Sequence, residues 1–453
     1  MKRVRIGNGG GFWGDSLDAP VRLVREGRLD YLTLDYLAEL TMSILAVQKQ
    51  KNPALGYATD FLEVARSLIP YLRSQPQLKI ITNAGGLNPK GCALAVRELF
   101  RQENLADVPI AVVGGDDLLP YLDELFARGH LLHHMDTGEP LAARRERVVS
   151  ANAYLGARPI VEALRQGARV VITGRVADAS LTVAPAAFAF GWGFGDADLD
   201  RLAAATVAGH LIECGAQVTG GLWTNASAHT RLADVGYPIV EMTEDGQFVV
   251  TKPPGSGGVV NLETVSEQLL YEVADPRAYY TPDVVVDFTA VTLEQQAEDV
   301  VAVRGACGIA TTETYKVSAA YRDGYTAAGT LVIVGPDAVA KAQLSGQIIL
   351  ERLRQAGWVF ERSYVEVLGA GDAVAGVLPR AVDPPEVVLR VAVHDHRREA
   401  VERFTRELAP LVTSGFAGTT GYTTGRPPVR EVFAFWPALI AKSAVSPTVE
   451  LLA

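Results

Sequence analysis

Short apolar runs alternate with longer stretches of helical periodicity over the first 214 residues of the chain. Each run has the length of one buried strand, and each stretch repeats its apolar residues at helical spacing. The runs predict strands at Lys2–Ile6, Leu29–Leu34, Leu78–Thr82, Val108–Val113 and Val170–Thr173. The stretches predict helices at Ala19–Gly27, Tyr36–Gln50, Thr59–Ser74, Gly91–Arg101, Val149–Gln166 and Asp198–Cys214. This alternation is typical of a parallel sheet with helices packed on its faces.

The pattern changes at Asp275–Tyr280, where a proline and two tyrosines interrupt the alternation. Beyond this point, strands and helices predict α+β layers. We therefore expect an α/β protein with a mostly parallel, Rossmann-like three-layer domain over residues 1–278 and a smaller α+β domain over residues 279–453. The Gly/Thr-rich segment Ser414–Pro428 is too long for a simple connection, and is expected to be a lid, an interface arm or a disordered loop.

Composition and charge narrow the class of partner. The 453 residues carry a formal net charge of −10 without a run of lysines or arginines, which argues against a nucleic-acid partner. The most apolar stretch, Leu181–Phe194, contains Pro185 and Gly191 and is too short to span a bilayer, so no membrane association is expected. Three widely spaced cysteines give neither a zinc-binding spacing nor a disulfide framework, and the first residues lack the apolar core of a signal peptide. We therefore expect a cytoplasmic protein.

Polar side chains follow the ends of the predicted strands. In VVITGRVADASL, Gly174 breaks the strand and Arg175 and Asp178 follow it at once. Because the carboxyl ends of parallel strands meet at one edge of a sheet, such side chains are expected to form a shared rim. The alternative is that Arg175 and Asp178 only pair with each other and cap the next helix. Asp35, after the second strand, either faces the same site or caps the following helix. The expected rim consists of Asp15, Asn83, Asp116, Arg175 and Asp178.

Three glycine-rich loops offer backbone amides that suit an anion, and they are GNGGGFWGDS, NAGGLNPKG and KPPGSGG. The first, GNGGGFWGDS, has glycines at the spacing of a dinucleotide-binding loop, but no acidic residue closes a second strand at the distance that a nicotinamide or flavin site requires. The third, KPPGSGG, leads into a helix N-terminus that favours a phosphate or carboxylate; a tight turn without a ligand is the alternative. The residues expected to bind a substrate or anion are Asn8, Gly10, Gly11, Asp15, Asn83, Gly85, Gly86, Lys252, Ser256, Gly257 and Gly258.

The sequence predicts neither a metal site nor a bound cofactor. Two segments, 133–139 and 394–396, contain residue types that bind metals, but solvated loop and strand-end residues are the simpler interpretation. Cys214 is a poor candidate nucleophile, because the nearest histidine in the sequence, His210, lies one helical turn away.

Seven motifs spread over nearly the whole chain carry a family resemblance. They are GGGFWGDS, LDYLTLDYLAELTM, ITNAGGLNPKG, VVITGRVADASL, HLIECGAQVTGG, KPPGSGGVVNLETVSEQLLYEVADPRAYYTPDV and TGRPPV. Together they resemble the acyclic terpene utilisation AtuA family. The resemblance implies a bacterial enzyme of carboxylate or acyl-CoA catabolism, encoded with the carboxylases and hydratases of citronellol and geraniol breakdown. The role proposed for the family is that of a lyase, which removes acetate from a branched 3-hydroxyglutaryl-CoA.

A carbon–carbon lyase of this kind needs a base for the tertiary hydroxyl and an electrophile for the enolate. We assign a bidentate grip on the substrate carboxylate to Arg175 and the acid/base role to Asp178, with Glu213 or Asp116 as further candidates. Amides of the first two glycine-rich loops are expected to stabilise an enolate oxygen. The third loop, Lys252–Gly258, is expected to hold CoA phosphates or a substrate carboxylate.

Two other functions are compatible with the sequence. The same residue types suit a hydratase or dehydratase of a small hydroxy acid or acyl-CoA. Alternatively, the chain is a non-catalytic binding subunit that needs a small accessory protein to complete a site. In either case the expected partner is a small molecule, with a CoA thioester as part of the substrate, and a homo-oligomer is expected because Gly/Thr-rich arms often need a partner surface.

Overall fold

The computed structural model describes residues 2–374, 376–377, 384–421 and 425–452. The chain forms two compact units, one of Met1–Ala320 with Phe435–Ala453, and one of Tyr321–Ala434. The domain division between residues 278 and 279 stays a prediction. Within the described residues, no helix has both the length and the apolar character needed to cross a membrane.

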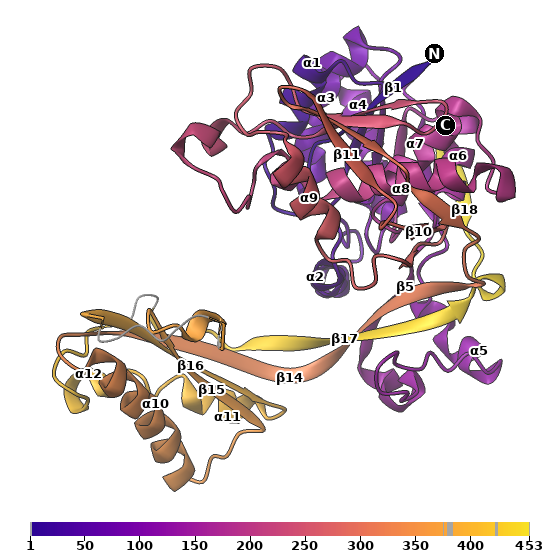
Figure 1. The fold of residues 1–453 in the computed structure, drawn as a ribbon. Coiled ribbons are helices and arrows are strands. Elements are labelled where there is room, and N and C mark those ends of the chain that lie inside the picture. Colours follow the sequence, from indigo (N-terminus) through magenta and orange to yellow (C-terminus); the bar gives the residue numbers. More distant parts are fainter. Residues whose placement is uncertain (1, 375, 378–383, 422–424, 453) are drawn as a thin grey trace. The chain divides into compact units, whose positions relative to one another are not determined.

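The first unit is built on a ten-stranded mixed sheet (Figure 1). Its centre is a parallel run in the order β1-β2-β3-β6-β4. These strands are β1 (Arg3–Asn8), β2 (Tyr31–Leu34), β3 (Lys79–Thr82), β6 (Val170–Thr173) and β4 (Ile110–Gly114). The bounds of all five strands agree within a few residues with the predicted apolar runs. Strands that are buried on both faces consist mostly of apolar residues, so the sequence makes them recognisable.

The remaining strands of this sheet run antiparallel to their neighbours. They are β7 (Ile239–Thr243), β8 (Phe248–Thr251), β12 (Val300–Arg304) and β11 (Thr292–Ala297) beyond β1, and β18 (Thr448–Leu452) beside β4. The α/β class is therefore confirmed, but the mostly parallel, Rossmann-like arrangement is not, because five of the nine strand pairings are antiparallel. The physical reason is partly local: a short turn with Gly246 at φ 87° lets β7 and β8 pair directly as a hairpin.

The helices of the first unit form two packed groups. Helices α1, α3 and α4 lie side by side, as do α6, α7 and α8. Sequence signals explain their ends: the Asn88 side chain accepts a hydrogen bond from the Gly91 amide at 3.0 Å and caps α4, whose first turn contains Pro89. The helices are α1 (Ala19–Gly27), α2 (Glu39–Lys51), α3 (Asp60–Ser74), α4 (Pro89–Gln102), α5 (Leu122–Ala127), α6 (Arg158–Arg165), α7 (Ser180–Phe190), α8 (Leu199–Glu213) and α9 (Leu262–Leu270).

The helix predicted at Val149–Gln166 is wrong in its first half. That half is strand β5 (Val148–Ala153), which is buried along its whole length and pairs with the long strand β14 (Thr314–Val334). Only the second half is helical, as α6, which begins at a proline-containing turn. A fully buried strand shows no alternation of apolar and polar residues, so periodicity could not distinguish it from a buried helix.

A small sheet and the second unit complete the fold. Helix α8 packs against strands β10 and β13 of a three-stranded antiparallel sheet. Its strands are β9 (Tyr279–Tyr280), β10 (Val285–Asp287) and β13 (Cys307–Ile309).

In the second unit, an antiparallel sheet in the order β15-β16-β14-β17 shares an apolar core with its helices. Its further elements are α10 (Ala338–Gln355), β15 (Arg362–Leu368), β16 (Glu386–Asp395), α11 (Arg398–Phe404), α12 (Leu411–Ser414) and β17 (Arg430–Ala441).

The segment Ser414–Pro428 lies only partly within the described residues, since 422–424 fall outside them. Its described part bonds to β14: the Gly418 carbonyl accepts a hydrogen bond from the Val334 amide at 3.0 Å, and the Thr420 amide donates to the Val332 carbonyl at 2.8 Å. The expectation of a lid, arm or disordered loop stays a prediction.

Candidate active site

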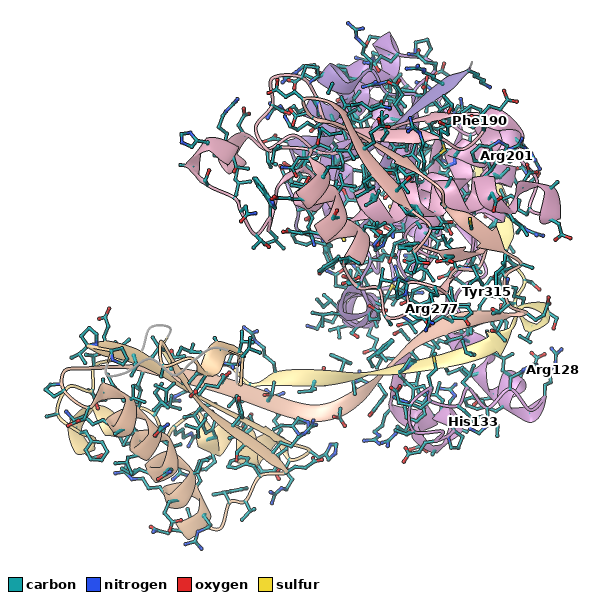
Figure 2. The ribbon with its side chains drawn as sticks, viewed as in Figure 1. Arg128, His133, Phe190, Arg201, Arg277 and Tyr315 are labelled. Atoms are coloured by element: carbon teal, nitrogen blue, oxygen red, sulfur yellow. The ribbon has the colours of Figure 1, made fainter. Side chains whose placement is uncertain are left out.

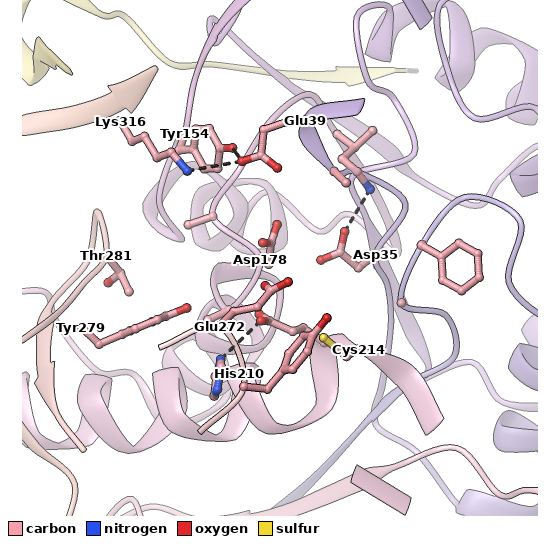
Figure 3. Close-up of a pocket in the computed structure, with 18 of the residues that line it drawn as sticks. Asp35, Glu39, Tyr154, Asp178, His210, Cys214, Glu272, Tyr279, Thr281 and Lys316 are labelled. Atoms are coloured by element: carbon pink, nitrogen blue, oxygen red, sulfur yellow. Dashed lines mark hydrogen bonds and ion pairs between the residues drawn. The ribbon is translucent and has the colours of Figure 1, made fainter. Parts of the chain in front are cut away.

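A cavity of about 880 Å³ lies in the first unit, where the carboxyl ends of β1, β2 and β6 meet the end of α8 (Figure 3). Loops after the three strands supply one wall, and α8, β9 and β14 supply the others. Its charged and titratable lining residues are Asp15, Asp35, Glu39, Tyr154, Arg175, Asp178, His210, Glu213, Cys214, Tyr237, Tyr271, Glu272, Tyr279, Tyr280 and Lys316. The structure thus brings together five residues of the predicted set, which are Gly11, Asp15, Arg175, Asp178 and Glu213.

Arg175 and Asp178 form a salt bridge on the cavity wall. The Arg175 guanidinium donates from Nη1 to Asp178 Oδ1 at 2.7 Å and to the Leu37 carbonyl at 2.9 Å. Its carbon Cζ lies 4.1 Å from the centre of the Tyr154 ring, and its side chain is only 2% exposed. Arg175 Nε is buried without a hydrogen-bond partner. The pair therefore bonds internally and also lines the cavity, with one guanidinium N–H unsatisfied; a buried, unpaired donor is costly and suits a ligand acceptor.

Glu213 and His210 form a second pair, one helical turn apart at the end of α8. Glu213 Oε1 lies 3.4 Å from His210 Nδ1, while Glu213 Oε2 is buried without a hydrogen-bond partner. Burial raises the pKa of Glu213 to about 7. Burial alone would lower the pKa of His210, but the hydrogen bond and charge of Glu213 outweigh it and raise that pKa. Two neighbouring groups with raised pKa values suit general acid–base chemistry.

Cys214, beside this pair, is not suited to nucleophilic chemistry. Burial and the charge of Glu213 raise the pKa of its thiol to about 12. Since the thiolate is the reactive form, the thiol is inert at neutral pH.

Asp35 faces the cavity and was absent from the predicted rim. Its Oδ1 accepts hydrogen bonds from Asn83 Nδ2 at 2.6 Å and from the Leu37 amide at 3.1 Å. Burial and then the charge of Asp178 raise its pKa well above the usual range. Helix α2 begins four residues later, with Ala38 at its N-cap, so Asp35 does not cap it. The predicted Asn83 therefore positions Asp35 rather than lining the cavity itself.

The sequence also did not predict a group of three interacting side chains on the cavity wall, which are Glu39, Tyr154 and Lys316. Glu39 accepts hydrogen bonds from the Tyr154 hydroxyl and, at 3.3 Å, from Lys316 Nζ. Lys316 Nζ lies 4.8 Å from the centre of the same Tyr154 ring that contacts Arg175. Lys316 comes from β14, far along the chain, so no spacing in the sequence links it to the strand-end residues.

The first glycine-rich loop holds the end of α8 in place. Asn8 Nδ2 donates to the carbonyls of Ile212 and Glu213 at 2.7 and 2.8 Å. The Gly11 amide donates to Asp15 Oδ2 at 2.9 Å, and the Gly10 carbonyl accepts from the Asp35 amide at 2.9 Å. These predicted residues thus organise the cavity wall through protein–protein hydrogen bonds.

We expect Gly11→Ala to destabilise the protein and Gly10→Ala to be nearly neutral. A Cβ on Gly11 would lie 2.7 Å from the carbonyl carbon of Cys214, so the backbone that carries Glu213 must shift. A Cβ on Gly10 would meet no atom closer than Asp15 Oδ2 at 4.0 Å. Overpacking of this kind costs about 1–3 kcal/mol. Urea unfolding of the two variants measures the difference, and equal stabilities would contradict the expectation.

Other predicted residues lie outside the cavity lining. Asp116 Oδ2 accepts hydrogen bonds from the Arg175 amide and from Asn152 Nδ2, both at 2.8 Å, and burial raises its pKa to about 6. It supports the backbone on which Arg175 stands. Gly85 packs so closely that a Cβ there would lie 2.5 Å from the Thr173 carbonyl oxygen, and neighbouring Gly86 is held at φ 51°.

The Lys252–Gly258 loop is bonded within the protein. Lys252 Nζ lies 2.8 Å from Asp299 Oδ2 and donates to the Ser256 carbonyl at 2.9 Å. The Ser256 hydroxyl donates to the Pro253 carbonyl at 2.6 Å, and the amides of Gly257 and Gly258 donate to backbone carbonyls, each at 2.7 Å. The donors expected to hold an anion are thus engaged by protein acceptors.

Among the described residues, no group of three or more His, Cys, Asp or Glu side chains has the arrangement needed to hold a metal ion. His133, in the segment after α5 (Figure 2), hydrogen-bonds through Nδ1 to the Gly138 carbonyl at 2.9 Å. His394 Nδ1 and His396 Nε2 lie 3.6 and 3.5 Å from Glu361 Oε2.

Comparison with known families gives a match over residues 4–451, to the family described as acyclic terpene utilisation family protein AtuA. Comparisons with curated proteins and with solved structures give no match.

Proposed function

Because this chain belongs to the acyclic terpene utilisation AtuA family, we propose that it is a catabolic lyase of acyclic terpene breakdown. The substrate is a branched 3-hydroxyacyl-CoA that carries a carboxymethyl group, or a related carboxylate. The enzyme breaks the bond between the carbinol carbon and the carboxymethyl group, and releases acetate.

The observation that carries this proposal is the presence of two distinct acid–base pairs on one cavity. Arg175 with Asp178 and His210 with Glu213 both line it, and each pair holds a buried nitrogen or oxygen without a hydrogen-bond partner. Cleavage of a 3-hydroxy acid needs one proton removed from the hydroxyl and one delivered to the departing carbon, and two groups at separate positions can perform the two transfers.

The proton transfers follow from these positions. The Asp178 carboxylate takes the proton of the tertiary hydroxyl, the carbon–carbon bond breaks, and its electron pair stays on the methylene carbon of the departing fragment. Glu213 delivers a proton to that carbon. Acetate and a 3-oxoacyl thioester leave, and no water or co-reactant is consumed. Arg175, on the same cavity wall, neutralises the charge that develops on the carboxylate of the departing fragment.

The charge of the cavity is compatible with an anionic substrate only when some of its carboxyl groups hold protons. Burial raises the pKa of Asp35, and raises that of Glu213 to about 7, so the wall carries less negative charge than its number of carboxyl groups suggests. Arg175 and Lys316 then provide positive charge for a carboxylate.

Exposed apolar side chains around the cavity suit a branched acyl chain. Five residues that line the cavity keep large apolar side chains between 48 and 83% exposed, and such a patch marks a binding surface. They are Phe12, Met135, Leu222, Tyr280 and Leu439.

The test is turnover by the purified chain, with branched 3-hydroxyglutaryl-CoA thioesters and the matching free acids as substrates, and products identified by mass spectrometry. Acetate and a 3-oxoacyl-CoA support the lyase. Loss of water with an unsaturated acyl product would instead show a dehydratase. Absence of turnover with every substrate would favour a binding subunit.

A further inference from the structure

We propose that His210 is a positioning residue that holds a proton toward Glu213, and so stabilises the Glu213 carboxylate that remains after proton delivery to the substrate. The catalytic part of this inference rests on the proposed function. The proton that His210 holds toward Glu213 does not rest on it, because that proton is a property of the protein without substrate.

The contacts of the imidazole fix which nitrogen faces Glu213. His210 Nε2 lies 3.0 Å from the carbonyl oxygen of Gln268, which accepts but cannot donate, so Nε2 carries a proton. The Gln268 side chain donates in return from Nε2 to the His210 carbonyl at 3.2 Å, which ties α9 to α8. His210 Nδ1 is thereby directed at Glu213 Oε1, 3.4 Å away.

The surroundings of His210 separate it from water. The side chain is 1% exposed, and its ring lies 5.5 and 5.4 Å from the ring centres of Tyr279 and Phe288. His210 Nδ1 and Glu213 Oε2 are both buried without a hydrogen-bond partner, and Glu213 Oε1 is the charged atom 3.4 Å from Nδ1.

The groups around the pair favour a proton on His210. Arg175 is engaged by Asp178, and the groups that face the pair from neighbouring elements are acids. These groups are Asp178 after β6, Glu272 after α9, Asp35 after β2, Tyr279 on β9 and the Cys214 thiol at the end of α8. The charges of Asp178 and Glu272 raise the pKa of Glu213, and they also stabilise a proton on His210 Nδ1. The Cys214 thiol and the Tyr279 hydroxyl add no negative charge, because burial raises their pKa values.

The proton balance of the step is simple. Before the reaction, Glu213 holds a proton on Oε2 and His210 holds one on Nδ1. Glu213 gives its proton to the substrate carbon, and an ion pair between imidazolium and carboxylate remains. After the products leave, Asp178 releases the proton that it took from the hydroxyl, and Glu213 takes up one proton. The enzyme thus returns to its starting state without a net gain or loss of protons. Without His210, a buried carboxylate is left without a counter-charge, so Glu213 becomes a weaker acid.

An experiment without substrate tests directly whether His210 holds a proton toward Glu213. In ¹⁵N NMR of the full chain with labelled histidine, we expect both ring nitrogens of His210 to stay protonated to higher pH than in Glu213→Gln. The titration midpoint in the variant should fall by about one unit or more. The six other histidines serve as internal controls, since Glu213→Gln should leave them unchanged. An identical His210 titration in the two proteins would overturn the inference whatever the reaction is.

Activity adds a second readout. His210→Gln is expected to lower turnover and to move the alkaline limb of the pH profile upward by about one to three units, because Glu213 loses its counter-charge. The exposed His229→Gln is the matched control and should leave the profile in place. A His210→Gln enzyme with reduced turnover but an unmoved alkaline limb would show a purely structural role. If this variant does not fold, the NMR comparison, in which His210 is intact, still decides.

Discussion

Replacing Glu213 by glutamine is expected to lower turnover about 10²–10⁴-fold, the range typical of a lost general acid. Glutamine keeps the shape of the side chain, but it cannot deliver a proton to the departing carbon. The exposed Glu298→Gln, in the same unit, is the matched control and should leave turnover unchanged. Steady-state kinetics of the two variants measure the effect. Wild-type turnover in Glu213→Gln would remove Glu213 from the mechanism.

The pH dependence of the wild-type enzyme follows from the same residue. Burial raises the pKa of the Glu213 carboxyl from 4.5 to about 7. Because Glu213 has to hold its proton before cleavage, turnover should fall as the pH rises through about 7. Whatever activity remains in Glu213→Gln should lack this limb.

The second large effect is expected for Arg175→Ala, which should destabilise the protein by about 3 kcal/mol, as breaking a buried ion pair does. The guanidinium is 2% exposed, so its removal leaves the Leu37 carbonyl unpaired and opens a void under the Tyr154 ring. The Asp178 side chain is 35% exposed, so water relieves part of the loss and the value falls at the low end for such pairs. Arg175→Lys keeps the positive charge but lacks the planar guanidinium. It should raise KM and should destabilise the protein less than Arg175→Ala does.

Urea unfolding with a double-mutant cycle measures this coupling. In Arg175→Ala with Asp178→Asn, no unpaired carboxylate remains, so the double variant should lose less stability than the sum of the single losses. Additive losses would contradict a coupled pair on the cavity wall.

The predicted residues that line the cavity are those next to regular elements. Arg175 and Asp178 follow an apolar strand that a glycine ends, and the structure places both on the cavity, as the geometry of parallel strand ends requires. Asp35 carries the same signal, and its orientation is decided by the Asn83 amide, which no local pattern reveals. The antiparallel pairing of β7, β8, β12, β11 and β18 could not be deduced from the strand–helix alternation of the central sheet.

The sequence did not predict the cavity residues that long-range contacts bring to the site. Lys316 reaches the cavity from β14, and Tyr154 follows a buried strand that resembles a helix in its periodicity. The amides of Gly257 and Gly258 show the opposite case, in which the sequence predicted binding donors that the structure pairs with protein carbonyls. Their sequence suits an anion, but whether a loop donates to a ligand or to its own carbonyls depends on tertiary packing.

The most direct test of carbon–carbon cleavage is to run the reaction of the purified chain in D₂O and to measure the mass of the acetate released. Protonation of a departing methylene carbon by Glu213 predicts acetate with a single deuterium in its methyl group. Acetate without deuterium, or no acetate at all beside an unsaturated product, would contradict the lyase.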